Sequence, residues 1–229
     1  MVTEDDIALL LHSLEDKLAV ASEYKAHSAL FIGADFSIFR FIDYESNLSA
    51  ILADLLDPSG SHGQGIVFLA LFIDMIEKSL PSSLTAAMAL REMRSSKRVL
   101  VKRELITGRK RFIDIVVSDG KLGIGIENKP FAKDLTDQLK HYALELSKRY
   151  RQWILLYLPG RAGTKPEKAS ISQELRYKYM SSGNYLDLCY AEDLADWTEA
   201  CIHACEAEKV RWFLRDFRDF SMTRFKDNG

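Results

Sequence analysis

Apolar side chains recur every three or four residues through the first part of the chain, a spacing typical of amphipathic helices. The first such stretch follows Thr3, which fits an N-cap, and its apolar residues are Ile7, Leu10, Leu11, Leu14 and Leu18. A second stretch starts near Glu45 and ends at a turn over residues 57–60. The pattern predicts helices over residues 3–30, 45–56, 64–80 and 84–94.

Runs of β-branched residues replace the helical spacing after residue 98. Three runs are separated by short polar turns, which predicts an antiparallel meander. Pro130 then fits the first turn of a helix, whose inner face would carry Leu135, Leu139, Tyr142 and Leu146. Residues 159–170, rich in Gly, Pro and Lys, indicate a mobile loop. The predicted strands are 99–106, 111–117, 121–127, 153–158 and 185–190, and further helices are predicted over 131–150, from 193 and from 206.

The order of these elements predicts an α/β fold, in which helices flank a mixed sheet. A length of 229 residues suits a single domain. Within it we expect a helical part over residues 1–95, a catalytic core over 96–160, and a loop, an edge strand and C-terminal helices over 161–229.

The composition is that of an ordinary globular protein, with 47% hydrophobic and 28% charged residues. Its longest apolar run, residues 66–76, contains Asp74 and is shorter than the roughly 20 residues of a membrane span, so we expect no membrane partner. The acidic N-terminus lacks a secretory signal, and three cysteines do not suit a disulfide scaffold, which favours a cytoplasmic protein. At helical spacing, Cys201, His203 and Cys205 fit core packing better than a metal site.

Charge is unevenly distributed, although the net charge is only −2. Residues 1–60 carry eleven acidic side chains against three Lys or Arg, whereas residues 91–111 carry nine Lys or Arg against two acidic ones. A basic run alone most often forms a solvated face, but beside a catalytic motif it favours contacts with nucleic-acid phosphates. The candidates for such contacts are Arg103, Arg109, Lys110, Arg111 and His62, although His62 also fits a role in capping a turn.

The hairpin formed by the second and third predicted strands carries candidate chemistry. An Asp-Gly pair at 119–120 favours a two-residue turn, which places Asp114 opposite Gly125, whereas a three-residue turn would reverse the faces. In the two-residue register Asp114 and Glu127 are diagonal neighbours about 7–8 Å apart, a gap that one divalent cation bridges. Gly123 and Gly125 would then leave space beside Asp114 for an ion or a phosphate.

Side-chain alternation in this register puts Asp114, Glu127 and Lys129 on one face of the hairpin and Asn128 on the other. Two converging carboxylates are costly without a compensating cation, and oxygen ligands suit Mg²⁺ or Mn²⁺. Such an ion lowers the pKa of bound water, and Lys129 would orient that water or stabilise developing charge. The hairpin is therefore a candidate hydrolytic site.

Asp114, the triplet at 127–129, Gln138 and Tyr142 together resemble the PD-(D/E)XK nuclease superfamily. The four-residue step from Gln138 to Tyr142 is similar to the RecB-like branch, and residues 44–65 resemble the N-terminal motif of an incompletely characterised bacterial family within the superfamily. The resemblance implies a restriction-endonuclease-like αβββαβ core with additional N-terminal and C-terminal helices. It also implies a metal-dependent hydrolase of DNA phosphodiester bonds.

The resemblance gives each matching residue a role. Asp114 and Glu127 would bind the metal, together with the backbone carbonyl of Asn128, and Lys129 would be the catalytic lysine. Glu45 matches an additional acidic metal ligand from an N-terminal helix, and it lies on the inward-facing stripe of its own predicted helix.

Gln138 and Tyr142, one helical turn apart, match the catalytic-site pair that positions nucleic acid or the scissile phosphate. Ile113 stands where the superfamily name has proline. The implied cofactor is Mg²⁺ or Mn²⁺, and the implied partners are DNA and, in addition, a homodimer mate or an accessory protein. A second interpretation keeps the same core without catalysis, as a protein that binds nucleic acid or another protein through residues 97–111.

Overall fold

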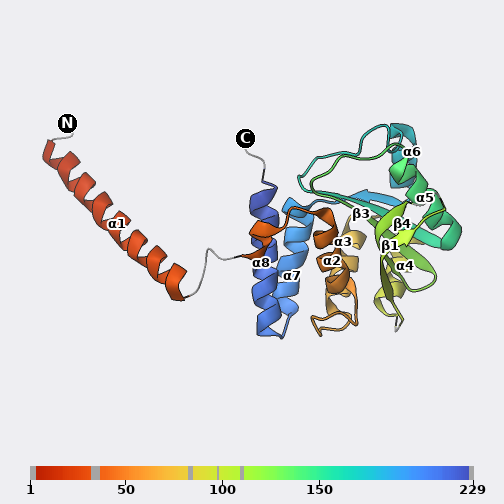
Figure 1. The fold of residues 1–229 in the computed structure, drawn as a ribbon, viewed down its shortest axis with the longest axis horizontal. Coiled ribbons are helices and arrows are strands. Elements are labelled where there is room, and N and C mark those ends of the chain that lie inside the picture. Colours follow the sequence, from red (N-terminus) through yellow and green to blue (C-terminus); the bar gives the residue numbers. More distant parts are fainter. Residues whose placement is uncertain (1–3, 32–36, 82–84, 97, 109–110, 227–229) are drawn as a thin grey trace. The chain divides into compact units, whose positions relative to one another are not determined.

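The protein is shown in Figure 1 as a computed structural model, which describes residues 4–31, 37–81, 85–96, 98–108 and 111–226. The chain divides into two compact units, Met1–Ile38 and Phe39–Gly229. The first unit contains helix α1 (Glu4–Phe31), in agreement with the predicted helix, while its expected N-cap Thr3 lies outside the described residues. Within the described ranges, none of the helices has the length and apolar character needed to span a membrane.

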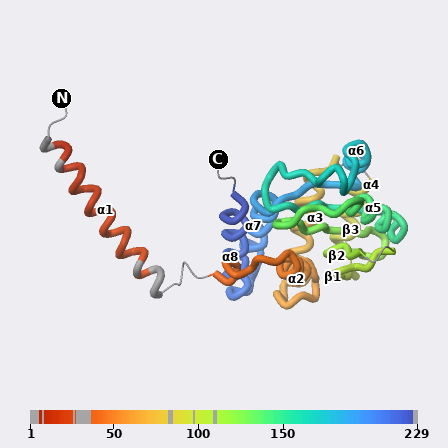
Figure 2. Tube along the Cα trace, turned by 45° about the horizontal axis from the view of Figure 1, so that its top comes forward, coloured from red at the N-terminus to blue at the C-terminus, as the bar shows by residue number. Residues whose placement is uncertain are grey.

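In the second unit, helices precede and follow a central sheet. The elements before the sheet are the short 3-10 helix η1 (Ile38–Phe41), α2 (Glu45–Leu56), α3 (Val67–Lys78) and α4 (Thr85–Arg94). Later in the chain come α5 (Gln138–Arg149), α6 (Gln173–Ser181), the π-helix η2 (Tyr190–Leu194), α7 (Ala195–Ala204) and α8 (Glu208–Arg224). Helices α7 and α8 lie side by side in both views of the molecule (Figures 1 and 2).

The sheet confirms the predicted mixed topology. Its strands are β1 (Leu100–Ile106), β2 (Phe112–Ser118), β3 (Leu122–Lys129), β4 (Gln152–Pro159) and β5 (Tyr185–Asp187), in the spatial order β1-β2-β3-β4-β5. The first three strands form the expected antiparallel meander, and β3, β4 and β5 are parallel. With α2 before the meander and α5 before β4, the chain contains the αβββαβ core that the sequence predicts.

Each face of the sheet packs against its own set of helices. Ile124 and Ile126 of β3 belong to a core built with α2, α3, α4, α7 and α8. On the opposite face Leu155 of β4 packs with Leu139 and Leu146 of α5. The odd-numbered side chains of β3 therefore lie on the α5 face, and Glu127 is one of them.

The turn between β2 and β3 is two residues longer than predicted. Ser118 is paired with Gly123, because the Asp119 side chain accepts hydrogen bonds from the backbone N–H groups of residues 121 and 122, each 2.9 Å long, and widens the turn to four residues. A shift of two residues preserves the faces, so Asp114 and Glu127 still share one. The observed register pairs Gly125 with Val116, so the predicted pairing of Asp114 with Gly125 is wrong.

The two glycines of β3 do not leave room for a ligand, contrary to the prediction. A Cβ atom at Gly123 would collide with the ring of Tyr150, and one at Gly125 would approach Leu146 Cδ1 to 2.7 Å. The space that a side chain would occupy at each glycine is thus filled by residues of the C-terminal half of α5 and by the residue after it. These glycines set the distance between α5 and the sheet.

Helix α5 begins at Gln138 rather than at residue 131, so the prediction that Pro130 opens it is wrong. The intervening backbone N–H groups have other partners: that of Leu135 donates to Gln138 Oε1 over 2.9 Å, and that of Asp137 donates to the carbonyl of residue 169 over 2.6 Å. Leu135, expected on the inner face, is 58% exposed.

Helix α6 was not predicted, because its sequence is mostly polar. Its N-terminus is nevertheless marked by Ser172, whose side chain accepts a hydrogen bond from the N–H of Leu175, as an N-cap does. The segment 159–170 before it contains no helix or strand, as the sequence suggests, apart from Pro159 at the end of β4.

Candidate active site

The hairpin of β2 and β3 brings the predicted catalytic side chains together. Lys129 Nζ lies 3.1 Å from Glu127 Oε1, and Asp114 Oδ2 accepts a hydrogen bond of 2.8 Å from the backbone N–H of Asn128. Glu127 is fully buried, and the Lys129 side chain is only 11% exposed. Two carboxylates and one lysine therefore occupy a largely buried site at the end of the hairpin.

The two oxygens of Glu127 have different surroundings. Oε1 accepts hydrogen bonds from Gln138 Nε2, over 2.6 Å, and from Lys129 Nζ. Oε2 is buried and has no hydrogen-bond partner among the described residues. A buried carboxylate oxygen without a partner is costly, and a divalent cation would satisfy it. The donor set of Glu127 and Asp114 therefore fits a hard cation bound at Oε2.

Burial shifts the proton equilibria of this cluster. Burial raises the pKa of Asp114 to about 6, with a further contribution from the nearby charge of Glu45. The pKa of Glu127 is raised well above its usual range by burial and then by the charge of Asp114. For Lys129, burial acts against the charged form, but Glu127 and Glu45 outweigh it and raise its pKa. The lysine therefore keeps its proton, while the two carboxylates share excess negative charge that favours a cation or a proton.

Glu45, the first residue of α2, faces the segment after β3. Its Oε1 accepts hydrogen bonds from the backbone N–H groups of Phe131, over 3.3 Å, and Ala132, over 2.8 Å, while Oε2 lies 3.4 Å from Lys129 Nζ. No three His, Cys, Asp or Glu side chains in the described part of the chain form a complete metal-binding group. As arranged here, Glu45 connects α2 to Lys129 and to the backbone that leaves the site.

Gln138 and Tyr142 lie beneath Glu127 and are 4% and 2% exposed. Gln138 Nε2 donates to Glu127 and also lies 3.2 Å from the Tyr142 hydroxyl, which donates to the carbonyl of Phe112 over 2.5 Å. The structure does not bring either side chain to a surface where nucleic acid would touch it. Instead, the pair links α5 to both strands of the hairpin and orients the Glu127 carboxylate.

The Asn128 side chain lies on the opposite face of the sheet, as predicted. Its Nδ2 donates to Ser49 Oγ over 2.9 Å and to the Glu45 carbonyl over 3.3 Å, and its Oδ1 accepts from the Tyr190 hydroxyl over 2.8 Å. Ser49 and Tyr190 are separated from Asn128 by 79 and 62 residues along the chain. No local pattern could have indicated them, since the contact exists only in the folded chain.

The strands β1 and β2 are distorted at the level of Asp114. Glu104, which the ladder places opposite Asp114, has a φ of 50°, a left-handed conformation that few residues other than glycine adopt. Side-chain alternation changes there, because Arg103 points to α2 whereas Leu105 packs on the α5 face. Strained backbone of this kind often accompanies functional sites.

Two of the basic candidates for phosphate contacts, Arg103 and Arg111, form hydrogen bonds with backbone carbonyls. Arg103 Nη2 donates to the Ser46 carbonyl over 3.2 Å, and Arg111 Nη1 donates to the Thr136 carbonyl over 2.7 Å. Both are therefore bound to backbone close to the site. Arg109 and Lys110 lie outside the described residues.

His62, a candidate for contact with nucleic acid, is buried in the loop between α2 and α3. It is 6% exposed and stacks on the ring of Phe68. Its Nδ1 accepts from the N–H of Gln64 over 3.0 Å, so its Nε2 carries the proton and donates to the Asp57 carbonyl over 2.9 Å. Both ring nitrogens thus close the loop between α2 and α3, which is the turn-capping alternative that the sequence left open.

The two cysteines near the C-terminus lie in the core, as expected, whereas His203 does not. Cys201 and Cys205 are buried, and the exposed His203 lies 3.0 Å from Glu199 on the same helix. These residues do not converge on a metal site.

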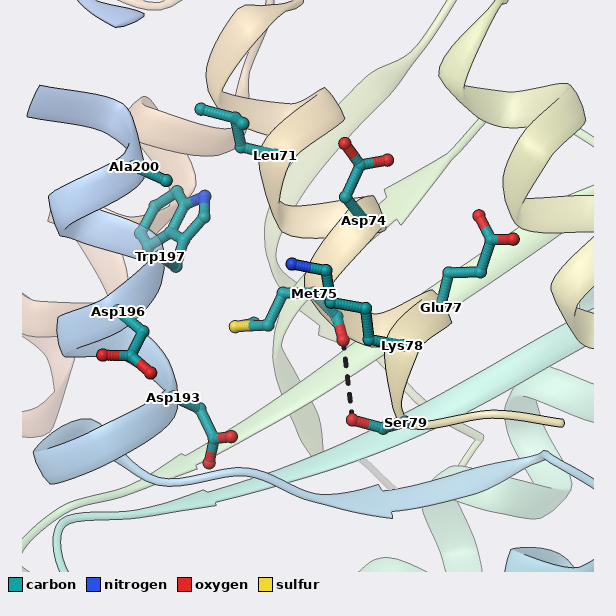
Figure 3. A pocket seen from close by; sticks show the side chains of 10 residues that line it. All are labelled: Leu71, Asp74, Met75, Glu77, Lys78, Ser79, Asp193, Asp196, Trp197 and Ala200. Carbon is teal, nitrogen blue, oxygen red and sulfur yellow. Dashed lines mark hydrogen bonds between the residues drawn. The ribbon is translucent and has the colours of Figure 1, made fainter. Parts of the chain in front are cut away.

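A surface cleft of about 580 Å³ lies between α3 and α7, away from the hairpin (Figure 3). Its walls carry the carboxylates of Asp74, Glu77, Asp193 and Asp196, and one cation, Lys78. Arg94 and Arg91 pair with Asp74 and Glu77, but the lining itself still carries more carboxylates than cations, which does not favour a phosphodiester backbone. Despite its volume, this cleft is therefore poorly suited to bind a nucleic-acid substrate.

A mixed sheet flanked by helices, with an aspartate and a Glu-x-Lys triplet converging at the end of its central hairpin, defines a restriction-endonuclease-like protein. The family model of the PD-(D/E)XK nuclease superfamily matches residues 36–219, and the chain belongs to this superfamily. The match includes every residue of the hairpin site. Membership supports a nuclease-type function, the cleavage of phosphodiester bonds, in a superfamily that generally uses divalent metals. No curated protein and no solved structure matches the chain.

Proposed function

We propose that this protein is a Mg²⁺- or Mn²⁺-dependent deoxyribonuclease. The observation that carries the proposal is the state of Glu127, whose Oε1 is saturated by two donors while its buried Oε2 has none. With Asp114 beside it, this oxygen is where a divalent cation would compensate the site. Asp114, Glu127 and the backbone carbonyl of Asn128 are the proposed ligands, and Glu45 is an additional acidic residue of the site.

A bound Mg²⁺ or Mn²⁺ would lower the pKa of a coordinated water and neutralise charge on the phosphate. The protein's own residues do the positioning. Gln138 holds the Glu127 carboxylate, and the Asn128 N–H holds that of Asp114. Lys129 keeps its proton on Nζ, because Glu127 and Glu45 raise its pKa, and can donate a hydrogen bond to the attacking water or to a phosphate oxygen.

The pairing of Gln138 with Tyr142 supports the further proposal that the chain belongs to the RecB-like branch. DNA is the proposed substrate because the residue pattern resembles DNA nucleases. The interpretation as an inactive binding protein has less support, since Asp114, Glu127 and Lys129 are all present and in contact. A site that had lost catalysis would not need to retain this costly cluster of buried charges.

The test is a cleavage assay on linear, circular and single-stranded DNA and on RNA, with Mg²⁺, Mn²⁺ or EDTA. The compared proteins are the wild type, Asp114→Asn and Lys129→Met, with the exposed α6 substitutions Glu174→Gln and Lys178→Met as controls. We expect cleavage of DNA that requires metal, is lost in both site variants and persists in both controls. Cleavage that survives in Asp114→Asn, or that proceeds in EDTA, would contradict the proposal.

A further inference from the structure

A polar cleft opens beside Lys129, at the carboxyl ends of β3 and β4. Lys129 is paired with Pro159 in the parallel register, and Gly160 and Arg161 follow directly. The cleft has a volume of about 570 Å³, within the roughly 300–1,000 Å³ of typical ligand sites. Ligands of sheets with parallel strands bind at the carboxyl ends of the strands. The cleft is therefore a direct continuation of the candidate active site.

The lining of this cleft is positively charged, unlike the cleft between α3 and α7. Its polar side chains are Lys129, Tyr157, Arg161, Thr164 and Arg224, and no lining residue is acidic. Lys129 is already paired with Glu45 and Glu127, but neither Arg161 nor Arg224 contacts a carboxylate within the described ranges. Two unpaired guanidinium groups are thus held at one site on a protein whose net charge is −2. Such a site selects anions.

The arginine of α8 is held in place by aromatic packing. The Arg224 guanidinium lies 5.7 Å from the centroid of the Phe131 ring, in cation–π geometry, and the Phe131 and Phe225 rings are 5.6 Å apart. Gly160 makes this packing possible, because a Cβ atom there would collide with the Phe225 ring. The end of α8 is thereby fixed against the segment that follows β4, and its cation is preorganised over the cleft.

We infer that this cleft binds the phosphate backbone of the nucleic-acid strand immediately next to the scissile bond. Arg161 and Arg224 would contact phosphate oxygens, which guanidinium groups bind in bidentate geometry. The identity of the ligand rests on the proposed nuclease function, whereas the anion site itself rests on the lining of the cleft.

The test compares two double variants that each remove two positive charges from the whole chain. Arg161→Ala/Arg224→Ala removes the cleft arginines. The control, Arg151→Ala/Arg215→Ala, removes one exposed arginine just before the opposite end of β4 and one exposed arginine earlier in α8. Binding of a fluorescein-labelled duplex and of the matching single strand is measured by anisotropy in EDTA, so that cleavage plays no part, over a series of salt concentrations. Circular dichroism checks that the variants are folded.

We expect the cleft variant to weaken binding about tenfold or more, and to lower the slope of log affinity against log salt by about 2, one for each phosphate contact. The control variant should resemble the wild type in both measures. Equal affinities and slopes for the two double variants would overturn the inference, as would a wild type that does not bind either DNA.

Cleavage with Mg²⁺ separates this inference from the proposed function. If binding depends on the cleft arginines but no metal supports cleavage, the anion site stands and the nuclease proposal fails. If the wild type cleaves DNA and the cleft variant matches the control in both KM and kcat, the nuclease proposal stands and the cleft is not part of its substrate site. A raised KM with an unchanged kcat is the expected result.

Discussion

At the scale of single residues, the site depends on which oxygen of Glu127 is occupied. Gln138 and Lys129 both donate to Oε1, so Oε2 is the atom that is left for a cation. The sequence indicated Gln138 through its spacing from Tyr142, and the structure shows that the pair contacts Glu127 and the backbone of Phe112. Both side chains are buried under the carboxylate, where they act on Glu127 rather than on a substrate.

Replacing Gln138 by Met should therefore lower the apparent affinity for Mg²⁺ by about 10–100-fold, as is typical when the partner of a metal ligand is removed. The affinity for DNA in EDTA should stay the same, because Gln138 is buried. Mg²⁺ titration of the cleavage rate gives the first quantity, and anisotropy gives the second. The exposed Gln173→Met at the start of α6 is the control. If Gln138→Met weakens DNA binding and leaves the Mg²⁺ titration unchanged, the residue contacts the substrate after all.

The raised pKa of Asp114 leads to a prediction about how the free energy of unfolding depends on pH. Burial raises its pKa from 3.8 to about 6, so in the metal-free protein its contribution to the free energy of unfolding falls as pH rises from about 4 to 6 and stays low above that. The full difference is on the order of 3 kcal/mol. We expect Asp114→Asn to be more stable than the wild type at pH 8 in EDTA. The difference in the free energy of unfolding between the two proteins should become smaller towards pH 4.

Urea unfolding of both proteins at pH 4, 6 and 8 measures the difference in their free energies of unfolding. Saturating Mg²⁺ should stabilise the wild type at pH 8 and close part of the difference, because a bound cation stabilises only the folded state. An Asp114→Asn protein that is less stable than the wild type at pH 8 in EDTA would show that the carboxylate is already compensated by the protein.

At the scale of elements, the hairpin shows why a prediction can be correct in its faces and wrong in its register. Alternation along a strand depends only on parity, and the observed turn is longer by an even number of residues. The prediction that Asp114 and Glu127 share one face therefore did not depend on the exact length of the turn. It could not show that the Asp119 side chain would lengthen the turn.

The contact of α5 with β3 gives a prediction for Gly123. Because a Cβ atom there would collide with the Tyr150 ring, Gly123→Ala should lower the free energy of unfolding by about 1–3 kcal/mol. Tyr150→Leu should reduce that cost, since the smaller side chain leaves space. Urea unfolding of the two single variants and the double variant measures the coupling. If Gly123→Ala is fully stable and loses Mg²⁺ binding instead, the glycine would be part of a ligand pocket, as the sequence first suggested.

At the scale of the whole molecule, the site is assembled from segments distant in the chain. Glu45 comes from α2, Lys129 from β3, Arg161 from the segment after β4, and Arg224 from the end of α8. All of them belong to the unit Phe39–Gly229, which has its own core and includes nearly all of the residues matched by the superfamily model.

A chain that lacks residues 1–36 should therefore fold and keep the site. We expect its unfolding midpoint in urea and its Mg²⁺-dependent cleavage per molecule to match those of the full chain, because none of the described residues in the deleted part belongs to the site or to either hydrophobic core. Light scattering of both proteins at matched concentration reports the oligomeric state. A loss of cleavage together with a change from dimer to monomer would show that α1 assembles the active form.

The sequence by itself predicted the order of the core elements, the mixed sheet and the grouping of Asp114, Glu127 and Lys129 on one hairpin, because helical spacing, strand alternation and a short motif are local properties of the chain. The tertiary structure alone decided the start of α5 and the hydrogen-bond partners of Asn128 and His62. It also brought Arg161 and Arg224 beside Lys129. Each of these depends on hydrogen bonds or packing between segments far apart in the chain, and such contacts leave no periodic trace in either segment.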